Sequence, residues 1–180
     1  LEPDFGFNKE YLQVTFSGHR GFHLHYRDPS YFHLGSEARR ELVSHIRGEG
    51  VEVSDLLERS RHPDATGWAK RVGMGIESVV DKLDQIHSGD TATLRTMTSA
   101  LKEMMDREGM KGLRGKSSVE KLSELMQSPS RRERVLDGRL AALNNHALLF
   151  QNLIRADTSV VLGSAGETDE VVTIDTRRQI

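Results

Sequence analysis

The 180-residue sequence contains no cysteine, and that absence excludes several kinds of site at once. Disulfide bonds, thiol catalysis and cysteine-ligated zinc or iron–sulfur sites all require this side chain. Long apolar runs are lacking too, since no stretch approaches the ~20 residues that a membrane-spanning helix needs, so we expect no membrane partner. Basic residues do not dominate, because the formal net charge is −2. We therefore expect no general nucleic-acid coat protein, although a local basic cleft is compatible with this composition.

Aromatic side chains are rare beyond residue 32, where Trp68 and Phe150 are the only ones. Aromatic and β-branched residues favour a pleated, half-buried surface, so the N-terminal stretch is predicted to contain sheet. Two alternating stretches there, residues 11–16 and 21–26, flank a short connection that contains Gly18. This arrangement predicts a β-hairpin, with a turn at residues 28–29 ending its second strand.

The middle of the chain has helical periodicity instead. A first helix is predicted from Ser36, with Gly48 as its C-terminal stop. From Thr66 to Arg155, apolar residues recur at steps of three and four, which predicts a series of amphipathic helices. Two pairs with capping-box spacing predict helix starts within this region: Ser117 with Glu120, and Ser130 with Glu133.

The C-terminal part returns to short β-branched stretches, residues 159–162 and 170–175, which predict strands. We therefore expect an α+β fold, in which a mixed or antiparallel sheet carries a largely helical insert. The expected division is an N-terminal sheet-containing part at 1–65, a helical subdomain at 66–156 and return strands at 157–180.

The first candidate site is the predicted hairpin connection. Gly18 and Gly21 allow backbone N–H groups to approach a ligand closely, and Ser17 offers a hydroxyl. The Arg20 guanidinium matches a phosphate group with two parallel hydrogen bonds, and His23 adds a further donor. Together they suggest a polyphosphate pocket. The alternative is an ordinary hairpin turn with Arg20 in water.

Two further candidates concern metals. His23 and His25 share one face of the predicted strand and lie near His19, so they could form a metal pair, although no third ligand has convincing spacing. Asp175 ends an apolar strand and precedes two arginines, a position suited to Mg²⁺ or Mn²⁺ near phosphates. The alternatives are hydrogen-bonded strand histidines and a surface ion pair of Asp175.

Other basic residues carry weaker signals. The three arginines of one predicted helix start fit a solvated surface, with contact to a nucleic-acid template as the alternative; they are Arg131, Arg132 and Arg134. The basic residues of the glycine-rich stretch 109–116 fit a linker, with a nucleic-acid backbone contact as the alternative.

The combination of these features resembles a known family. Residues 16–25 resemble the second sequence motif of the archaeal and eukaryotic DNA primase catalytic (small) subunit. Residues 4–7 look like the approach to that motif, and residues 36–41 look like the helix that follows it. Residues 172–180 are similar to the third motif, in which an Asp precedes basic residues. The resemblance is closest to archaeal members, and the helical middle matches only in kind.

The resemblance implies a nucleotidyltransferase that makes short RNA or DNA primers from nucleoside triphosphates on single-stranded DNA during replication. Asp175 would be one of three carboxylates that hold two Mg²⁺ or Mn²⁺ ions, with the others outside this sequence. The nucleotide-binding residues it implies are Ser17, Gly18, His19, Arg20, Gly21 and His23. His19 departs from the second Arg of many eukaryotic members.

The resemblance also implies the primase large subunit as a partner and a cytoplasmic, nucleoid-associated location in an archaeon. The first acidic motif and the C-terminal basic and histidine segment are not found, so we expect an internal fragment that is inactive alone. Two alternatives differ in class: a non-catalytic helical interaction module, and a histidine-dependent metal hydrolase. Triphosphate binding separates the first alternative, and metal content separates the second.

Overall fold

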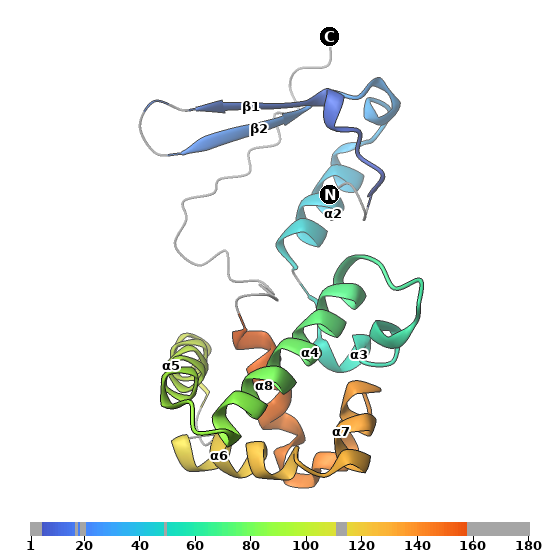
Figure 1. The fold of residues 1–180 in the computed structure, drawn as a ribbon. Helices are drawn as coiled ribbons and strands as arrows, with labels where there is room; N and C mark the ends of the chain where they lie inside the picture. The colour runs from blue at the N-terminus through green and yellow to red at the C-terminus, as the bar shows by residue number, and fades with distance from the viewer. Residues whose placement is uncertain (1–4, 17, 19–20, 49, 111–114, 158–180) are drawn as a thin grey trace. The chain divides into compact units, whose positions relative to one another are not determined.

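The computed structural model describes residues 5–16, 18, 21–48, 50–110 and 115–157 (Figure 1). These residues divide into two compact units, one ending at Gly50 and the other beginning at Val51. The predicted return strands at 159–162 and 170–175 lie outside the described residues. An antiparallel strand pair in one unit and helices in the other agree with the expected α+β class.

The first unit contains the predicted hairpin. β1 (Leu12–Phe16) pairs antiparallel with β2 (Phe22–Tyr26), and the register places Val14 opposite Leu24. Two short 3-10 helices flank the pair, η1 (Lys9–Tyr11) before it and η2 (Pro29–Tyr31) after it. Pro29 occupies the first turn of η2, where its missing N–H costs nothing, and the strand therefore ends where the sequence predicted.

Four of the early aromatic residues, Phe5, Phe7, Tyr26 and Tyr31, pack together at the end of the hairpin away from its connection. The Phe7 ring stacks on Tyr26 with 4.2 Å between centroids, and Tyr31 meets Phe7 edge-on at 5.0 Å. Phe5 makes an edge contact of 4.9 Å with His45 of the helix α2 (Ser36–Arg47). Such offset and edge-on pairs contribute beyond the area they bury, so the cluster joins the N-terminal segment, the hairpin and α2.

Polar contacts fix the same region. The Tyr26 hydroxyl donates to Asp28 at 3.0 Å and accepts from the backbone N–H of Asn8. Desolvation raises the pKa of the Tyr26 phenol, whereas hydrogen bonds from the hydroxyl and N–H of Ser30 lower the pKa of Asp28. These bonds secure the entry to β1 and the exit from β2.

α2 begins and ends as predicted, with Gly35 before it and Gly48 after it. Gly48 has φ 68°, the left-handed conformation that commonly closes a helix, and its N–H reaches the carbonyls of Ser44 and His45.

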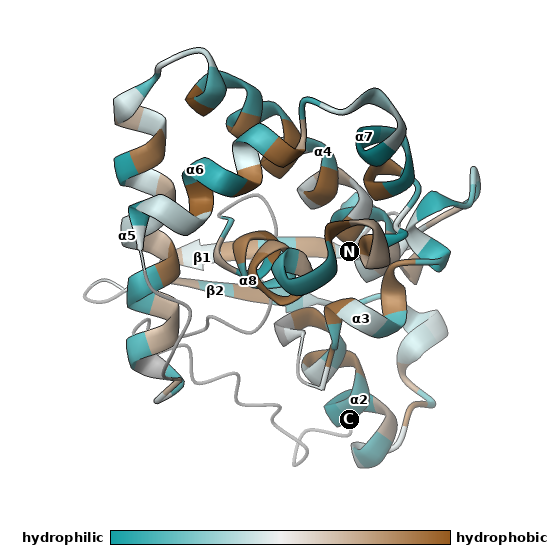
Figure 2. Cartoon of the chain, turned by 90° about the horizontal axis from the view of Figure 1, so that it is seen from below, coloured by the Kyte–Doolittle hydropathy of each residue, from teal (hydrophilic) through white to brown (hydrophobic). Residues whose placement is uncertain are grey.

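The second unit is helical. It comprises α3 (Val53–Leu56), η3 (Arg59–Arg61), α4 (Gly67–His87), α5 (Thr91–Arg107), α6 (Lys116–Leu125), α7 (Pro129–Leu136), η4 (Leu140–His146) and α8 (Ala147–Ala156). α4 is central, because α3, α5, α6, α7 and α8 all contact it. Its predicted apolar stripe, including Ile76 and Leu83, is buried in the core with Phe150 of α8. Figure 2 shows apolar and polar residues interleaved along α5 and α6, as amphipathic helices require.

Residues 51–65 belong to this helical unit, because Val53 and Leu57 are buried in its core. The predicted boundary at residue 65 therefore lies too late, since the helical unit begins at Val51. This stretch is short and rich in charge, and its apolar residues repeat over only one helical turn, so the sequence pattern did not predict a helix there. Within the described ranges, no helix is both long and apolar enough to cross a membrane.

The two predicted capping boxes are wrong. α6 starts one residue before Ser117, after Gly115, and α7 starts at Pro129, after Ser128. Neither N-terminal residue makes a side-chain cap. Pro129 sets the helical φ at the first position of α7, which displaces the start by two residues from the predicted one.

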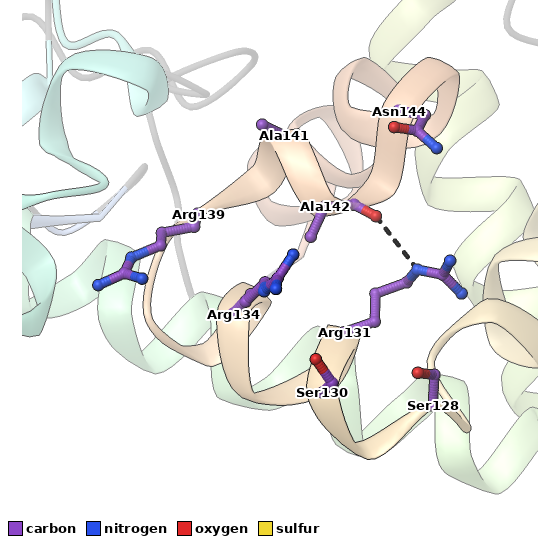
Figure 3. A pocket seen from close by; sticks show the side chains of 8 residues that line it. All are labelled: Ser128, Ser130, Arg131, Arg134, Arg139, Ala141, Ala142 and Asn144. Carbon is purple, nitrogen blue, oxygen red and sulfur yellow. Dashed lines mark hydrogen bonds between the residues drawn. The ribbon is translucent and has the colours of Figure 1, made fainter.

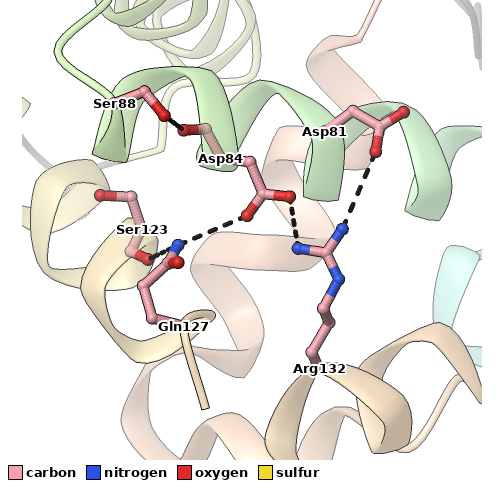
Figure 4. Close-up of polar contacts among 6 residues, drawn as sticks. All are labelled: Asp81, Asp84, Ser88, Ser123, Gln127 and Arg132. Atoms are coloured by element: carbon pink, nitrogen blue, oxygen red, sulfur yellow. Dashed lines mark hydrogen bonds and ion pairs between the residues drawn. The ribbon is translucent and has the colours of Figure 1, made fainter. Parts of the chain in front are cut away.

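α7 is tied to α4 by one arginine (Figure 4). Arg132 forms a close hydrogen-bonded ion pair with Asp84 and lies 4.0 Å from a carboxylate oxygen of Asp81. Gln127 donates to the other oxygen of Asp84 at 3.4 Å. After α8, the buried Asp157 accepts from Lys82 at 2.7 Å and from Ser78 at 3.0 Å. These contacts fix the orientation of α7 and the end of α8 against α4.

Candidate functional site

The hairpin connection contains two glycines in backbone conformations that other residues rarely adopt. Gly18 has φ 82° and Gly21 has φ 138°. A Cβ at either position would have no heavy atom within 4 Å, so the requirement for glycine is conformational rather than steric. The predicted Ser17, His19 and Arg20 lie outside the described residues.

Polar side chains gather on one face of the hairpin. The register sets Thr15 opposite His23 and Gln13 opposite His25, so all four lie on this polar face. The Thr15 hydroxyl and the His25 Nε2 are 3.2 Å apart, and the His23 and His25 rings are 6.2 Å apart at an interplanar angle of 29°. The prediction that His23 and His25 share one face of the strand is confirmed, and His23 is exposed.

The opposite surface, here called the apolar hairpin face, consists of Val14, Phe16, Phe22 and Leu24. Their exposed fractions run from 55% for Val14 to 75% for Phe22. The Phe16 and Phe22 rings lie 5.3 Å apart across the strands. This pair closes the ladder beside the glycine connection, so it stabilises the strand ends from which the connection leaves.

The described residues do not by themselves form a metal centre. Across them, no three histidine or carboxylate side chains are grouped as a metal would require. The pair His23 and His25 therefore lacks a third described ligand. Asp175, the predicted metal ligand, lies outside the described ranges, so its role stays a prediction.

A polar hollow lies in the helical unit, between α7 and the segment that follows it (Figure 3). It is lined by Ser128, Ser130, Arg131, Arg134, Arg139, Ala141, Ala142 and Asn144. Arg131 and Arg134, which were predicted to lie at a solvated helix start, line this hollow. The sequence shows that both arginines belong to one helix, but it does not show that residues 139–144 lie opposite them.

The sequence matches the family described as DNA primase small subunit over residues 1–180. This chain belongs to that family. The match includes the glycine connection, the polar face of the hairpin and the helical unit, and it confirms the resemblance inferred from residues 16–25 and 172–180.

Archaeal relatives agree with this assignment. A DNA primase small subunit from Methanothrix thermoacetophila is 33% identical over the whole chain, which covers 47% of that relative. One from Methanocella arvoryzae is 28% identical, with the same coverage of both chains. One from Halobacterium salinarum is 38% identical over 54% of this chain and 28% of its own length. The chain thus spans about half the length of the relatives that it matches throughout. No solved structure matches it significantly.

Proposed function

We propose that this primase-family chain contributes to an enzyme that makes short RNA or DNA primers from nucleoside triphosphates on single-stranded DNA. The observation that supports this most is the family match over residues 1–180, which includes the glycine connection of the hairpin. The proposed partners are the large primase subunit, the template strand and the incoming nucleotide.

The hairpin would hold the triphosphate of the incoming nucleotide. The backbone N–H groups at Gly18 and Gly21 can approach phosphate oxygens because neither residue carries a side chain. Ser17 and Arg20 would supply a hydroxyl and a guanidinium, and His19 would add a weaker contact. The described geometry supports a role for His23, whose exposed ring lies on the polar face beside His25.

Thr15 would hold a histidine of the polar face in place and would not itself bind the triphosphate. Its hydroxyl lies 3.2 Å from His25 Nε2, and its backbone pairs with that of His23. The His23 ring lies beside the His25 ring, with 6.2 Å between their centroids. The polar face would thus present His23 toward an anionic ligand, with Thr15 and His25 as its neighbours.

Asp175 would bind Mg²⁺ or Mn²⁺ together with carboxylates that are not among the described residues. Such ions neutralise the charge on a triphosphate and activate an attacking hydroxyl group. The donor set of the described residues does not complete this site, so the proposal for Asp175 depends on the family resemblance alone.

Triphosphate binding tests the proposal directly. Titration calorimetry with a non-hydrolysable nucleoside triphosphate and Mg²⁺ should show binding that weakens about tenfold or more in Arg20→Ala, because a charge-assisted contact is lost. Arg40→Ala is the matched control, since Arg40 is exposed on α2 and outside the hairpin. Equal affinity in wild type, Arg20→Ala and Arg40→Ala would refute the assignment.

His23→Ala and His33→Ala form a second pair. We expect weaker binding in the first and unchanged binding in the second, because His33 follows η2 and is not part of the paired strands. If the chain is instead a helical interaction module, neither the wild type nor any of these variants should bind triphosphate.

A further inference from the structure

The hollow beside α7 has the composition of an anion site. Its cavity volume is about 580 Å³, and its lining combines three arginines, two serines and an asparagine with two alanines. No carboxylate is part of this lining. Figure 3 shows Arg131 and Arg134 rising from α7 toward the facing segment, whereas Arg139 extends outward from that segment. A ligand that enters the hollow therefore meets positive charge and hydroxyl or amide groups.

Arg131 is held in place by the protein and retains donors for a ligand. Its Nε donates to the carbonyl of Ala142 at 3.1 Å, and its Nη1 donates to the carbonyl of Leu125 at 3.3 Å. A guanidinium has five N–H donors, so these two bonds leave others available. A fixed arginine loses little side-chain entropy when it binds an anion, which favours binding over an unrestrained lysine or arginine.

The neighbouring acidic residues are paired with a different arginine. Asp84 and Asp81 lie against Arg132, on the side of α7 that faces α4. Among the residues that the structure describes, Arg131 and Arg134 form no ion pair with a carboxylate. Arg139 lies 3.9 Å from Asp137, a distance typical of a weak surface pair. The described residues of this unit therefore leave the positive charge of Arg131 and Arg134 without a carboxylate partner.

Asn144 adds a strained position at the rim of the hollow. Its backbone has φ 49° and ψ −123°, and it is the one residue other than glycine with positive φ in the described part of the chain. Glycine adopts this conformation at much lower cost. Strain of this kind persists where a side chain is needed or where surrounding structure enforces it, and it concentrates at binding sites. The exposed Asn144 amide offers both a donor and an acceptor.

We propose that this hollow binds a phosphate of single-stranded DNA, with Arg131 and Arg134 as the charged contacts and Asn144 as a hydrogen-bond donor. The proposal rests on the proposed function, which supplies a nucleic-acid template. The lining contains no aromatic ring on which a base could stack, and base stacking is how proteins usually retain single-stranded bases. The site therefore contacts the backbone and is independent of base sequence.

The charge contribution is tested by fluorescence anisotropy with a labelled single-stranded oligonucleotide at several salt concentrations. Arg134→Ala should weaken binding about tenfold at low salt and reduce the slope of log K against log salt by about 0.7, the value for one phosphate contact on a single strand. Arg95→Ala removes the same charge from an exposed position on α5 and should leave both quantities unchanged. Equal losses in both variants would show a general charge effect and overturn the proposal.

Asn144→Gly separates binding from folding. Glycine relieves the backbone strain and removes the amide, so we expect a higher melting temperature together with weaker oligonucleotide binding. A destabilised variant cannot produce that combination. Higher stability with unchanged DNA affinity would show that the amide makes no contact and would remove Asn144 from the site.

The same variants distinguish this inference from the proposed function. Arg134→Ala should retain triphosphate binding, and Arg20→Ala should retain most of the salt-dependent oligonucleotide binding. If Arg134→Ala binds DNA like wild type while Arg20→Ala loses triphosphate, the inference fails and the proposed function survives. If wild type binds neither ligand, both fail. Competition by inorganic phosphate at millimolar concentration should weaken DNA binding in wild type more than in Arg134→Ala, and equal competition would contradict a phosphate site here.

Discussion

Gly138 shows how one residue determines the path of the chain beside α7. It follows Asp137, the C-cap residue of that helix, and has φ 75°. A Cβ at this position would lie 2.5 Å from the carbonyl oxygen of Leu57, closer than real contacts allow. Gly138 therefore permits both the left-handed turn and the close approach of residue 138 to the backbone of Leu57. The segment that follows this turn lines the hollow.

Gly138→Ala should destabilise the protein by at least about 2 kcal/mol, since it adds backbone strain and a clash with main-chain atoms that cannot rotate away. Urea unfolding monitored by circular dichroism measures the loss. Gly89→Ala is the matched control, because Gly89 has φ 98° but a Cβ there would meet no atom within 4 Å. Gly89→Ala has only the cost of the backbone conformation and no clash. Similar losses of unfolding free energy in the two variants would therefore contradict a steric role for Gly138.

At the scale of elements, the start of α5 depends on a charged cap. The Asp90 carboxylate accepts from the backbone N–H groups of Ala92 and Thr93 and from the Thr93 hydroxyl at 2.6 Å. The hydrogen bond from the Thr93 hydroxyl is the largest cause of a lowered pKa at Asp90, followed by that from the Thr93 N–H. The ionised form therefore stabilises α5 more than the protonated form does.

A pKa that is lower in the folded state contributes stability at pH values above the ordinary aspartate pKa of about 3.9, and this contribution is lost as the pH falls through the folded value. We expect Asp90→Asn, which keeps a capping side chain, to remain folded at pH 7 and to lose less stability than wild type between pH 5 and pH 2. Thermal unfolding across that range measures the difference. Parallel pH profiles for the two proteins would show that the Asp90 charge does not contribute.

The elements that the sequence predicted well are those with an uninterrupted period. The hairpin alternates over both strands, and α4 repeats its apolar residues from Val72 to Ile86, so burial could be inferred from spacing. The starts of α6 and α7 were misplaced because Gly115 and Pro129, rather than a serine with a glutamate, determine them. Local motifs compete, and the sequence does not show which one prevails.

The two candidate sites also differ in how far the sequence predicts them. The glycine connection was predictable because its residues are adjacent in sequence. The hollow was not, because it depends on a turn at Gly138 and on the irregular backbone of Asn144, neither of which belongs to a repeating pattern. Arg131 and Arg134 were therefore visible as charges on a helix, but not as one wall of a cavity.

At the scale of the whole molecule, the apolar hairpin face leaves four large side chains exposed. A contiguous apolar surface of this kind binds hydrophobic dyes. Phe22→Thr keeps a residue suited to strands and removes the most exposed ring, so it should lower the fluorescence of an added naphthalene sulfonate dye. Gln13→Thr, on the polar face, is the control and should leave the signal unchanged. A signal that does not respond to Phe22→Thr would place the dye elsewhere.

The register of the hairpin also makes its two surfaces inseparable. Thr15 pairs with His23 and Val14 with Leu24, so polar and apolar surfaces are assigned by whether a position is odd or even. A slip of one residue would not shift the histidines slightly along the sheet but would turn them to the opposite side. The number of residues between Phe16 and Phe22 thus determines which side chains of β2 lie on the same face as those of β1. Adding or removing one residue there is expected to be more disruptive than replacing any single side chain within it.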